Sequence, residues 1–297
     1  MAGDGIIFFI FQLFLLNQIL GRVPRPTASF EGKTVIITGF NKGLGFEAAR
    51  HVVKPGAARL IRSTEKGEAA ECVLEESIAC DRAILERQDI CRAGKHRAAP
   101  DRYADRERGI ASEKWSWAEH HESMVTVNVI STFLLPLLLL PKLIETAAFY
   151  NTRPNLTIVS SDMHYTGIFN ILNSEKEADM ASRYPTTKLL EVFIVREMAA
   201  RRRAEPYPIT INTTNPGLCN SGLGGGEEGL LFKVGSRNLG YNASVGTESH
   251  GQYLDRCRIQ EPATVITDAV GMITQQRVWH ELIAKLEKIQ PGIAGNL

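Results

Sequence analysis

Short apolar runs alternate with longer segments of helical periodicity along much of the chain. The runs at 34–38 and 209–213 have the composition of strands that are buried on both faces of a sheet. Further strands are predicted at 58–61 and 155–160. Because strands that alternate with helices form βαβ units, the pattern predicts an α/β domain with a mostly parallel sheet.

Helices are predicted at 46–53, 119–145 and 181–203, and a fourth helix closes the chain. The second half of 119–145 is apolar all round, which is typical of a helix that is buried or lies at an interface. The segment 181–203 is apolar on most faces and suits the core or a subunit interface. A single apolar stripe marks the last helix, formed by Val278, Leu282, Leu286 and Ile289.

The pattern fails between residues 65 and 113. Residues 82–108 are rich in charge and follow neither helical nor alternating apolar periodicity. Two buried strands belong in this interval if the sheet is complete, and neither is visible. We therefore expect the third and fourth strands to be missing or degraded within a single domain that spans 30–297.

The first 29 residues are predicted to form an apolar helix and a linker. Residues 5–20 are apolar except for Gln12 and Asn17, but such a run is short for a bilayer span. The start of the chain also lacks the basic charge of a signal peptide. A helix on the protein or on a membrane surface and a membrane anchor stay open as alternatives, which carbonate extraction of cell membranes would separate.

Composition narrows the function classes. The chain has 297 residues, of which 44% are hydrophobic and 23% charged, and its net charge is +1. This balance gives no electrostatic case for binding nucleic acid. The five cysteines lack CxxC spacing, so neither a disulfide framework nor a metal site is indicated. Reduced thiols predict a cytoplasmic protein, with membrane association through 5–20 left open.

A glycine-rich turn follows the first predicted strand and leads into a helix. Gly39 permits a tight turn, Gly43 lets the backbone approach a pyrophosphate, and Gly45 allows close packing of helix and strand. A strand, a turn and a helix in this order form the context of a dinucleotide-phosphate site, because the phosphates lie on the helix N-terminus. The remaining predicted cofactor contacts in the turn are Asn41, Lys42 and Leu44.

Arg62 follows the second predicted strand, at the position that faces the adenosine ribose in a βαβ unit. An acidic residue there favours NAD, and a cation accommodates the 2′-phosphate of NADP. Arg62 therefore favours NADP, and a solvated arginine without a ligand is the alternative.

Acid/base chemistry is indicated between 155 and 188. Ser161 follows an apolar strand, and Tyr184 and Lys188 lie four residues apart at the start of a long apolar helix. Residues four apart share one face of a helix, so the two side chains can converge with a serine that approaches from the sheet. Such a site suits exchange of a proton with a carbonyl or a carbinol.

These residues resemble the short-chain dehydrogenase/reductase family, across about 30–290. The shared motifs are the turn 38–45, Asn128, Ser161, Tyr184-x-x-x-Lys188 and Pro216-Gly217. The sequence around these motifs looks most like a fungal, retinol-dehydrogenase-like branch of the family. The resemblance implies a three-layer, doubly wound Rossmann fold and NAD(P)-dependent oxidoreductase activity.

The resemblance also implies roles for single residues. Tyr184 is the general acid/base, and Lys188 lowers the pKa of the tyrosine and holds the nicotinamide ribose. Ser161, chosen over Ser160 from the family pattern, donates a hydrogen bond to the carbonyl oxygen. Asn128 holds a water that continues the proton relay. The nicotinamide pocket is formed by Pro216 and Gly217, with Ser221 at the carboxamide.

The function expected from these motifs is the interconversion of a lipophilic alcohol and its ketone or aldehyde, with NADP(H) preferred and NAD(H) also compatible. The glycine-rich segment 222–226, within a lid region at 217–245, suits a greasy substrate. His164 is interpreted as a pocket-wall or core residue, because Tyr184 already fills the acid/base role. A homo-oligomer is compatible with the apolar helices. The alternative is a degenerate family member without activity, surviving as an interaction protein.

The family's Asp after the third strand and its Asn-Ala-Gly after the fourth are both absent here. Back-translation of 90–109, read one base later, permits a family-like helix, a strand and an Asn-Ala-Gly. We therefore predict that about 87–109 are out of frame. The coding DNA tests this hypothesis, which fails if no single-base shift near residues 86 and 110 restores the strand.

Overall fold

The computed structural model describes residues 23–37, 43–57, 59–61, 109–168, 179–201, 207–217 and 230–297. The apolar segment 5–20, nearly all of the segment proposed to be out of frame and the glycine-rich segment 222–226 lie outside these residues. The described strands are β1 (Thr34–Ile36), β2 (Arg59–Ile61), β3 (Trp117–Ala118), β4 (His121–Glu122), β5 (Asn155–Val159), β6 (Thr210–Asn215), β7 (Tyr253–Asp255) and β8 (Arg258–Gln260).

The helices and helical turns that accompany the strands follow in chain order. They are α2 (Gly43–Val53), the π-helical η1 (Val125–Ser131), α5 (Thr132–Tyr150), the 3₁₀ turn η2 (Asp162–Thr166), α6 (Met180–Arg201), α7 (Leu230–Asn242), η4 (Thr247–Ser249), α8 (Thr264–Thr267), α9 (Ala269–Ile289) and η5 (Ile293–Asn296).

Parallel pairing dominates the sheets, as predicted. β1 pairs in parallel with β2, and β5, β6 and β7 form a second parallel set whose edge is closed by the antiparallel β8. The parallel neighbours are joined through helices, since α2 lies between β1 and β2, α6 between β5 and β6, and α7 between β6 and β7. These are the βαβ units of a doubly wound domain.

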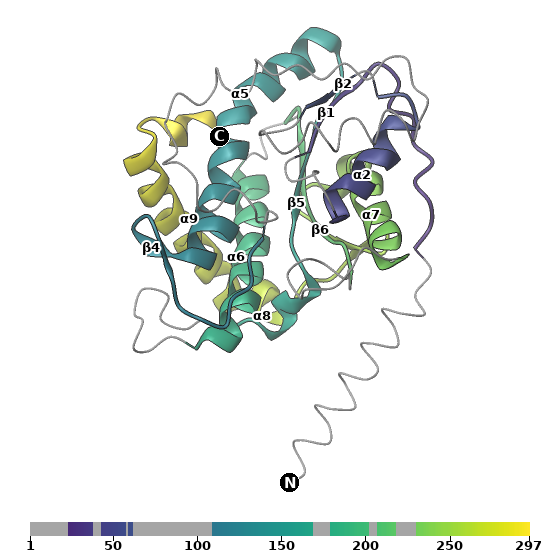
Figure 1. Ribbon diagram of the computed structural model, residues 1–297. Helices are drawn as coiled ribbons and strands as arrows, with labels where there is room; N and C mark the ends of the chain where they lie inside the picture. Colours follow the sequence, from purple (N-terminus) through teal and green to yellow (C-terminus); the bar gives the residue numbers. More distant parts are fainter. Residues whose placement is uncertain are drawn as a thin grey trace.

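Helices cover both faces of the parallel strands (Figure 1). α2 and α7 pack together on one side, and α5, α6 and α9 lie on the other. The larger hydrophobic core lies under the second group, where Phe133, Leu137 and Leu140 of α5 meet Ile194 of α6 and Leu282 of α9. This layering places the N-terminal turn of α6 at the carboxyl end of β5, where the candidate site is found.

Two of the expected patterns need correction. β1 was expected to be buried on both faces, but Thr34 is exposed and Ile36 is 36% exposed. Val35 and Ile37 pack on the cluster formed by α2, so one face of β1 is covered within the described chain. In the last helix Leu282 and Leu286 are buried and Val278 packs on the core, but Ile289 is 39% exposed because it lies in the final turn.

The helix expected at 119–145 begins later than predicted. Residues 117–122 form an antiparallel hairpin, because Glu119 adopts a left-handed backbone with φ of 56° that breaks a helix. The helical stretch then runs through η1 to Tyr150. By length and composition Val125–Tyr150 could cross a membrane, but most of its buried apolar residues belong to the larger core of the domain.

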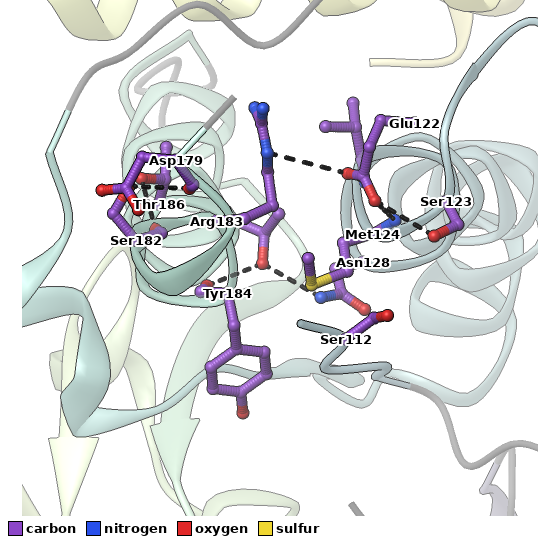
Figure 2. A network of polar contacts seen from close by, with 12 residues as sticks. Ser112, Glu122, Ser123, Met124, Asn128, Asp179, Ser182, Arg183, Tyr184 and Thr186 are labelled. Carbon is purple, nitrogen blue, oxygen red and sulfur yellow. Dashed lines mark hydrogen bonds and ion pairs between the residues drawn. The ribbon is translucent and has the colours of Figure 1, made fainter. Parts of the chain in front are cut away.

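A buried polar network joins the start of this stretch to α6 (Figure 2). Glu122 accepts hydrogen bonds from the backbone N–H groups of Met124 (2.8 Å) and Val125 (3.1 Å), and so caps the helical stretch that contains Asn128. The Arg183 Nε lies 4.0 Å from Glu122 Oε2, and both side chains are fully buried. The Arg183 guanidinium also stacks on Trp115 at 5.4 Å.

Replacement of Arg183 by Met should lower the free energy of unfolding by about 3 kcal/mol, because it leaves the Glu122 carboxylate buried without its cation. Urea denaturation followed by circular dichroism measures this loss. Arg277→Ala is the control, since the Arg277–Glu281 pair is largely exposed, and we expect a change within about 0.5 kcal/mol. Equal losses in the two variants would show that the buried pair does not hold the two helices together.

Candidate active site

The structure describes the glycine-rich turn from Gly43 onward, where α2 begins. Gly43 is buried, has φ of 61° and is the first residue of α2. A left-handed backbone at this position favours glycine, because a Cβ atom there would be strained. Leu44 and Gly45 continue the first turn of α2. The other predicted cofactor contacts of this half, which lie outside the described residues, are Gly39, Asn41, Lys42 and Arg62.

Two adjacent serines end β5, and the structure separates their positions. Ser160 is buried and donates its hydroxyl to the Lys188 carbonyl oxygen at 3.0 Å. Ser161 is only partly buried, accepts a hydrogen bond from the Met163 N–H and donates to Asp162 Oδ1, both at 3.1 Å. Ser160 therefore serves the packing of α6 on the strand, and Ser161 is the serine that acts to lower the pKa of the Tyr184 phenol.

Tyr184 and Lys188 lie on one face of α6, as their spacing predicts. The Lys188 Nζ lies 5.6 Å from the centre of the Tyr184 ring. The ring points away from the neighbouring Arg183, so the two polar side chains of this turn serve opposite sides of the helix (Figure 2). Burial raises the pKa of the Tyr184 phenol; Lys188 and the hydrogen bond with Ser161 oppose this shift, and Glu191 and Asp162 add to it.

The Lys188 ammonium is almost fully buried and is held at three points. Its Nζ donates to the Val159 carbonyl oxygen at 3.1 Å and to both carboxylate oxygens of Glu191, at 2.8 and 3.1 Å. Burial disfavours the charged lysine, but the pKa of Lys188 is raised because Glu191 and the Tyr184 phenol outweigh the loss of water. The ammonium is therefore fixed between the end of β5 and the face of α6 that carries Tyr184.

Asn128 lies in the π-helical turn η1 and is fully buried. Its amide brackets the backbone of Ile110: Oδ1 accepts from the Ile110 N–H at 2.8 Å, and Nδ2 donates to the Ile110 carbonyl at 2.9 Å. Nδ2 also donates to the Thr187 hydroxyl at 3.0 Å, which donates to the Tyr184 carbonyl. The side chain thus fixes the segment at Ile110 against the helix of Tyr184.

Gly109 is a neighbour of the site that the sequence analysis did not single out. A Cβ atom at this residue would meet Lys188 Nζ at 3.6 Å and Asn128 Oδ1 at 3.7 Å. It stands at the end of the segment 90–109, where the shifted reading frame ends in Asn-Ala-Gly. The Asn-Ala-Gly of the shifted frame was the available signal for Gly109, because the printed sequence directly before this residue holds no recognisable motif.

Polar residues gather at the carboxyl ends of β5, β6 and β7. Asn215 Nδ2 donates to Asp255 Oδ1 at 3.2 Å, and Asn215 Oδ1 accepts from the Gly217 N–H at 3.0 Å. Gly217 has φ of 81°, which explains the glycine of the Pro216-Gly217 motif. Asp162, near the end of β5, has its pKa raised by burial, an effect that hydrogen bonds from Ser161 and Asn215 oppose. Ser221 lies outside the described residues.

His164 is a buried structural residue, in agreement with its interpretation as a pocket-wall or core side chain. Nδ1 lies 2.7 Å from the Ser161 carbonyl oxygen, and Nε2 accepts a hydrogen bond from the Ala263 N–H at 3.1 Å. Burial lowers the pKa of His164 to about 4, so the ring is neutral at neutral pH. It ties the serine turn to the segment before α8.

Glu191, Thr187 and Asp162 also belong to the site and were missed. Glu191 follows Lys188 by three residues, so a carboxylate on the same helix face was readable from the spacing. Thr187 and Asp162 each have one partner from a distant element, Asn128 and Asn215 respectively, and these two contacts give no local signal. Within the described residues, no three His, Cys, Asp or Glu side chains are grouped so that they could hold a metal ion.

Comparison with solved structures shows the Rossmann-type α/β fold expected from the pattern of strands and helices. An uncharacterised protein from Mycobacterium paratuberculosis superposes with a TM-score of 0.61 at 24% identity, covering 87% of this chain and 95% of that one. The NADPH-bound carbonyl reductase from chicken fatty liver gives a TM-score of 0.53 at 17% identity, covering 77% and 99%. No protein-family model matches the chain.

Curated relatives carry the assignment further. The short chain dehydrogenase/reductase dmxR8 of Cryptosporiopsis sp. is 39% identical over 323 aligned positions, which cover 95% of this chain and 99% of that protein. The short-chain dehydrogenase anuD of Penicillium roqueforti is 35% identical, covering 94% and 84%. The alignments are longer than the 297-residue chain, so each relative contains residues without a counterpart here. The chain belongs to the short-chain dehydrogenase/reductase family of oxidoreductases.

Proposed function

We propose that this chain interconverts a lipophilic alcohol and its ketone or aldehyde, with Tyr184 as the general acid/base and NADP(H) as the preferred cofactor. The observation that carries the proposal is the convergence of Tyr184, Lys188 and Ser161 at the carboxyl end of β5. Ligands of open α/β sheets bind at the carboxyl ends of the strands. The site therefore lies where a substrate carbonyl can reach a phenol, an ammonium and a hydroxyl.

The described residues fit a nicotinamide dinucleotide. The buried, left-handed Gly43 opens α2 after β1, as a pyrophosphate cradle requires. Gly109 lies beside the buried Lys188 ammonium without a side chain of its own, so ribose hydroxyls that approach there would replace one of the acceptors of Lys188. Gly43, Lys188, Pro216 and Gly217 would hold the cofactor, together with Gly39, Arg62 and Ser221. When bound, the nicotinamide supplies or accepts the hydride.

The chain's own residues handle the proton. In the reductive direction the Tyr184 hydroxyl gives its proton to the developing alkoxide, and in the oxidative direction the phenolate takes the proton of the carbinol. Ser161 turns its hydroxyl from Asp162 to the substrate oxygen and stabilises negative charge there. The Lys188 ammonium stabilises the phenolate that remains after proton transfer.

In this proposal the backbone around Asn128, and not its side chain, holds the relay water. The side-chain amide is already bonded to Ile110 and Thr187, so it is committed to holding the segment before η1. The π-helical turn Val125–Ser131 changes the backbone hydrogen-bond pattern around Asn128, as π-bulges at functional sites commonly do. A carbonyl oxygen in that turn would accept from the relay water.

A lipophilic substrate is favoured by the surface beside Ser161. Met163, Tyr165 and Ile168 follow the serine and are 37%, 50% and 54% exposed. Apolar side chains held in water next to a polar reaction centre suit a ligand with a polar end and an apolar body. We retain the cytoplasmic location, with peripheral membrane contact through 5–20, as part of the proposal; carbonate extraction of cell membranes tests that contact.

The alternative is a degenerate relative without activity, surviving as an interaction protein. It is favoured by the residues that dmxR8 has and this chain lacks, together with the absence of the adenine-binding Asp and of Asn-Ala-Gly from the printed sequence. The free energy of folding lost with the central strands could exceed the whole stability of a domain, which is typically about 5–15 kcal/mol.

Tyr184→Phe should lower the turnover of a carbonyl substrate by at least about 100-fold, because it removes the acid/base group and leaves the ring in place. NADPH affinity, measured by quenching of tryptophan fluorescence, should change less than about threefold. Tyr150→Phe is the matched control, since that side chain is 70% exposed at the end of α5. Activity retained in the Tyr184 variant would remove this tyrosine from the mechanism.

Thermal shift with NADPH and NADH separates the enzyme from the degenerate relative. We expect stabilisation by both cofactors, more by NADPH, and a selective loss of the NADPH effect in Arg62→Ala because the 2′-phosphate loses its cation. Arg25→Ala, at an exposed residue of the described chain, is the control. A cooperatively folded wild type that responds to neither cofactor would support the degenerate relative instead.

A further inference from the structure

Glu191 is a buried acid in the site that the proposed chemistry does not use. It is 1% exposed, lies on the α6 face of Tyr184 and Lys188, and contacts the Lys188 Nζ through both carboxylate oxygens, at 2.8 and 3.1 Å. Burial raises the pKa of Glu191, and the adjacent Lys188 ammonium acts in the opposite direction. Glu191 is therefore a buried acid in direct contact with the lysine of the proposed reaction centre.

The hydrogen bonds of Lys188 show what Glu191 does to the lysine. An ammonium has three protons, and the two Glu191 oxygens and the Val159 carbonyl account for all three. The lysine is therefore oriented before any cofactor binds. A cofactor hydroxyl gains a donor from Lys188 only by replacing one of these acceptors.

Glu191 also opposes the effect of Lys188 on the phenol. The charged or titratable groups that act on Tyr184 are Lys188 and Glu191 from α6 and Asp162 from η2. His164, in the same turn as Asp162, is neutral at neutral pH. Lys188 favours the phenolate, whereas Glu191 and Asp162 disfavour it. Lys188 is the single cation of this group. Its ammonium interacts with both the Glu191 carboxylate and the Tyr184 phenol.

We propose that Glu191 is a positioning residue that shares the Lys188 ammonium with the Tyr184 phenolate, keeps the phenol protonated at neutral pH and so biases the site toward carbonyl reduction. The inference rests on the proposed function of Tyr184 and Lys188. A protonated phenol is the form that donates to a carbonyl, whereas oxidation of an alcohol needs the phenolate. Removal of the Glu191 charge would leave the phenolate as the remaining anionic partner of Lys188 from this helix.

Glu191→Gln tests the charge, because the amide oxygen can still accept from Lys188. We expect the rising limb of kcat/KM against pH for alcohol oxidation, and the falling limb for carbonyl reduction, to move to lower pH by roughly 1 unit. Glu191→Asp retains the charge and should keep both limbs near those of the wild type. Glu197→Gln is the control on the same helix, since Glu197 bonds to Gln275 and Arg201. Coincident profiles for Glu191→Gln and the wild type, or a shift to higher pH, would overturn the proposal.

A second measurement needs no turnover. The phenolate absorbance of the wild type, minus that of Tyr184→Phe, titrates Tyr184 alone. The same difference is taken between Glu191→Gln and the double variant Glu191→Gln/Tyr184→Phe; we expect a midpoint roughly 1 unit lower without the Glu191 charge, and an equal or higher midpoint would contradict the role of Glu191. A folded wild type without activity in either direction would refute the proposed function, and this titration would still decide the role of Glu191.

Discussion

The buried ammonium of Lys188 is the constraint on which the site depends. A buried cation is stable only where anions, carbonyl oxygens or aromatic rings surround it. Here the Glu191 carboxylate, the Val159 carbonyl oxygen and the Tyr184 ring surround the Lys188 ammonium. Because these partners come from both β5 and α6, the same contacts fix the helix on the sheet. Thus the Lys188 ammonium, which acts to lower the pKa of Tyr184, also helps to hold this tyrosine in register with Ser161.

A second set of contacts joins the site to η1 and to the hairpin before it. Asn128 binds Ile110 and Thr187, and the hairpin before it carries Glu122, which is paired with Arg183. Tyr184 therefore stands in a turn of α6 whose neighbours on both sides are anchored to the η1 segment (Figure 2). Polar networks of this kind cost desolvation, and they define one arrangement where apolar packing alone would allow several.

Much of the fold and of the site could be predicted because the decisive signals are local. The strand–glycine–helix order at β1–α2 and the Tyr-x-x-x-Lys spacing each lie within one element or one connection. The predicted helix start at Glu119 was wrong because the left-handed backbone of this residue lies in a hairpin, and the helix begins only after that hairpin. The bonds of Asn128 to Ile110, and of Asp162 to Asn215, join elements that no periodicity relates, so sequence reasoning had no access to them.

The two parallel pieces of sheet bear directly on the activity. In a doubly wound sheet the fourth strand lies beside the first, so the strand between β1 and β5 would come from the chain between β2 and η1. Of that interval the structure describes only the end, where Gly109 and Ile110 already lie against Lys188 and Asn128. Within the described residues, the proposed acid/base residues are held by contacts that involve Gly109, Ile110 and η1, whereas the turn before Gly43 and Arg62 lie outside them. We expect a chain with the intervening segment altered to keep the proposed acid/base pair but to lose affinity for the adenosine end of the cofactor, so cofactor binding would be a more sensitive measure of such an alteration than the geometry of Tyr184.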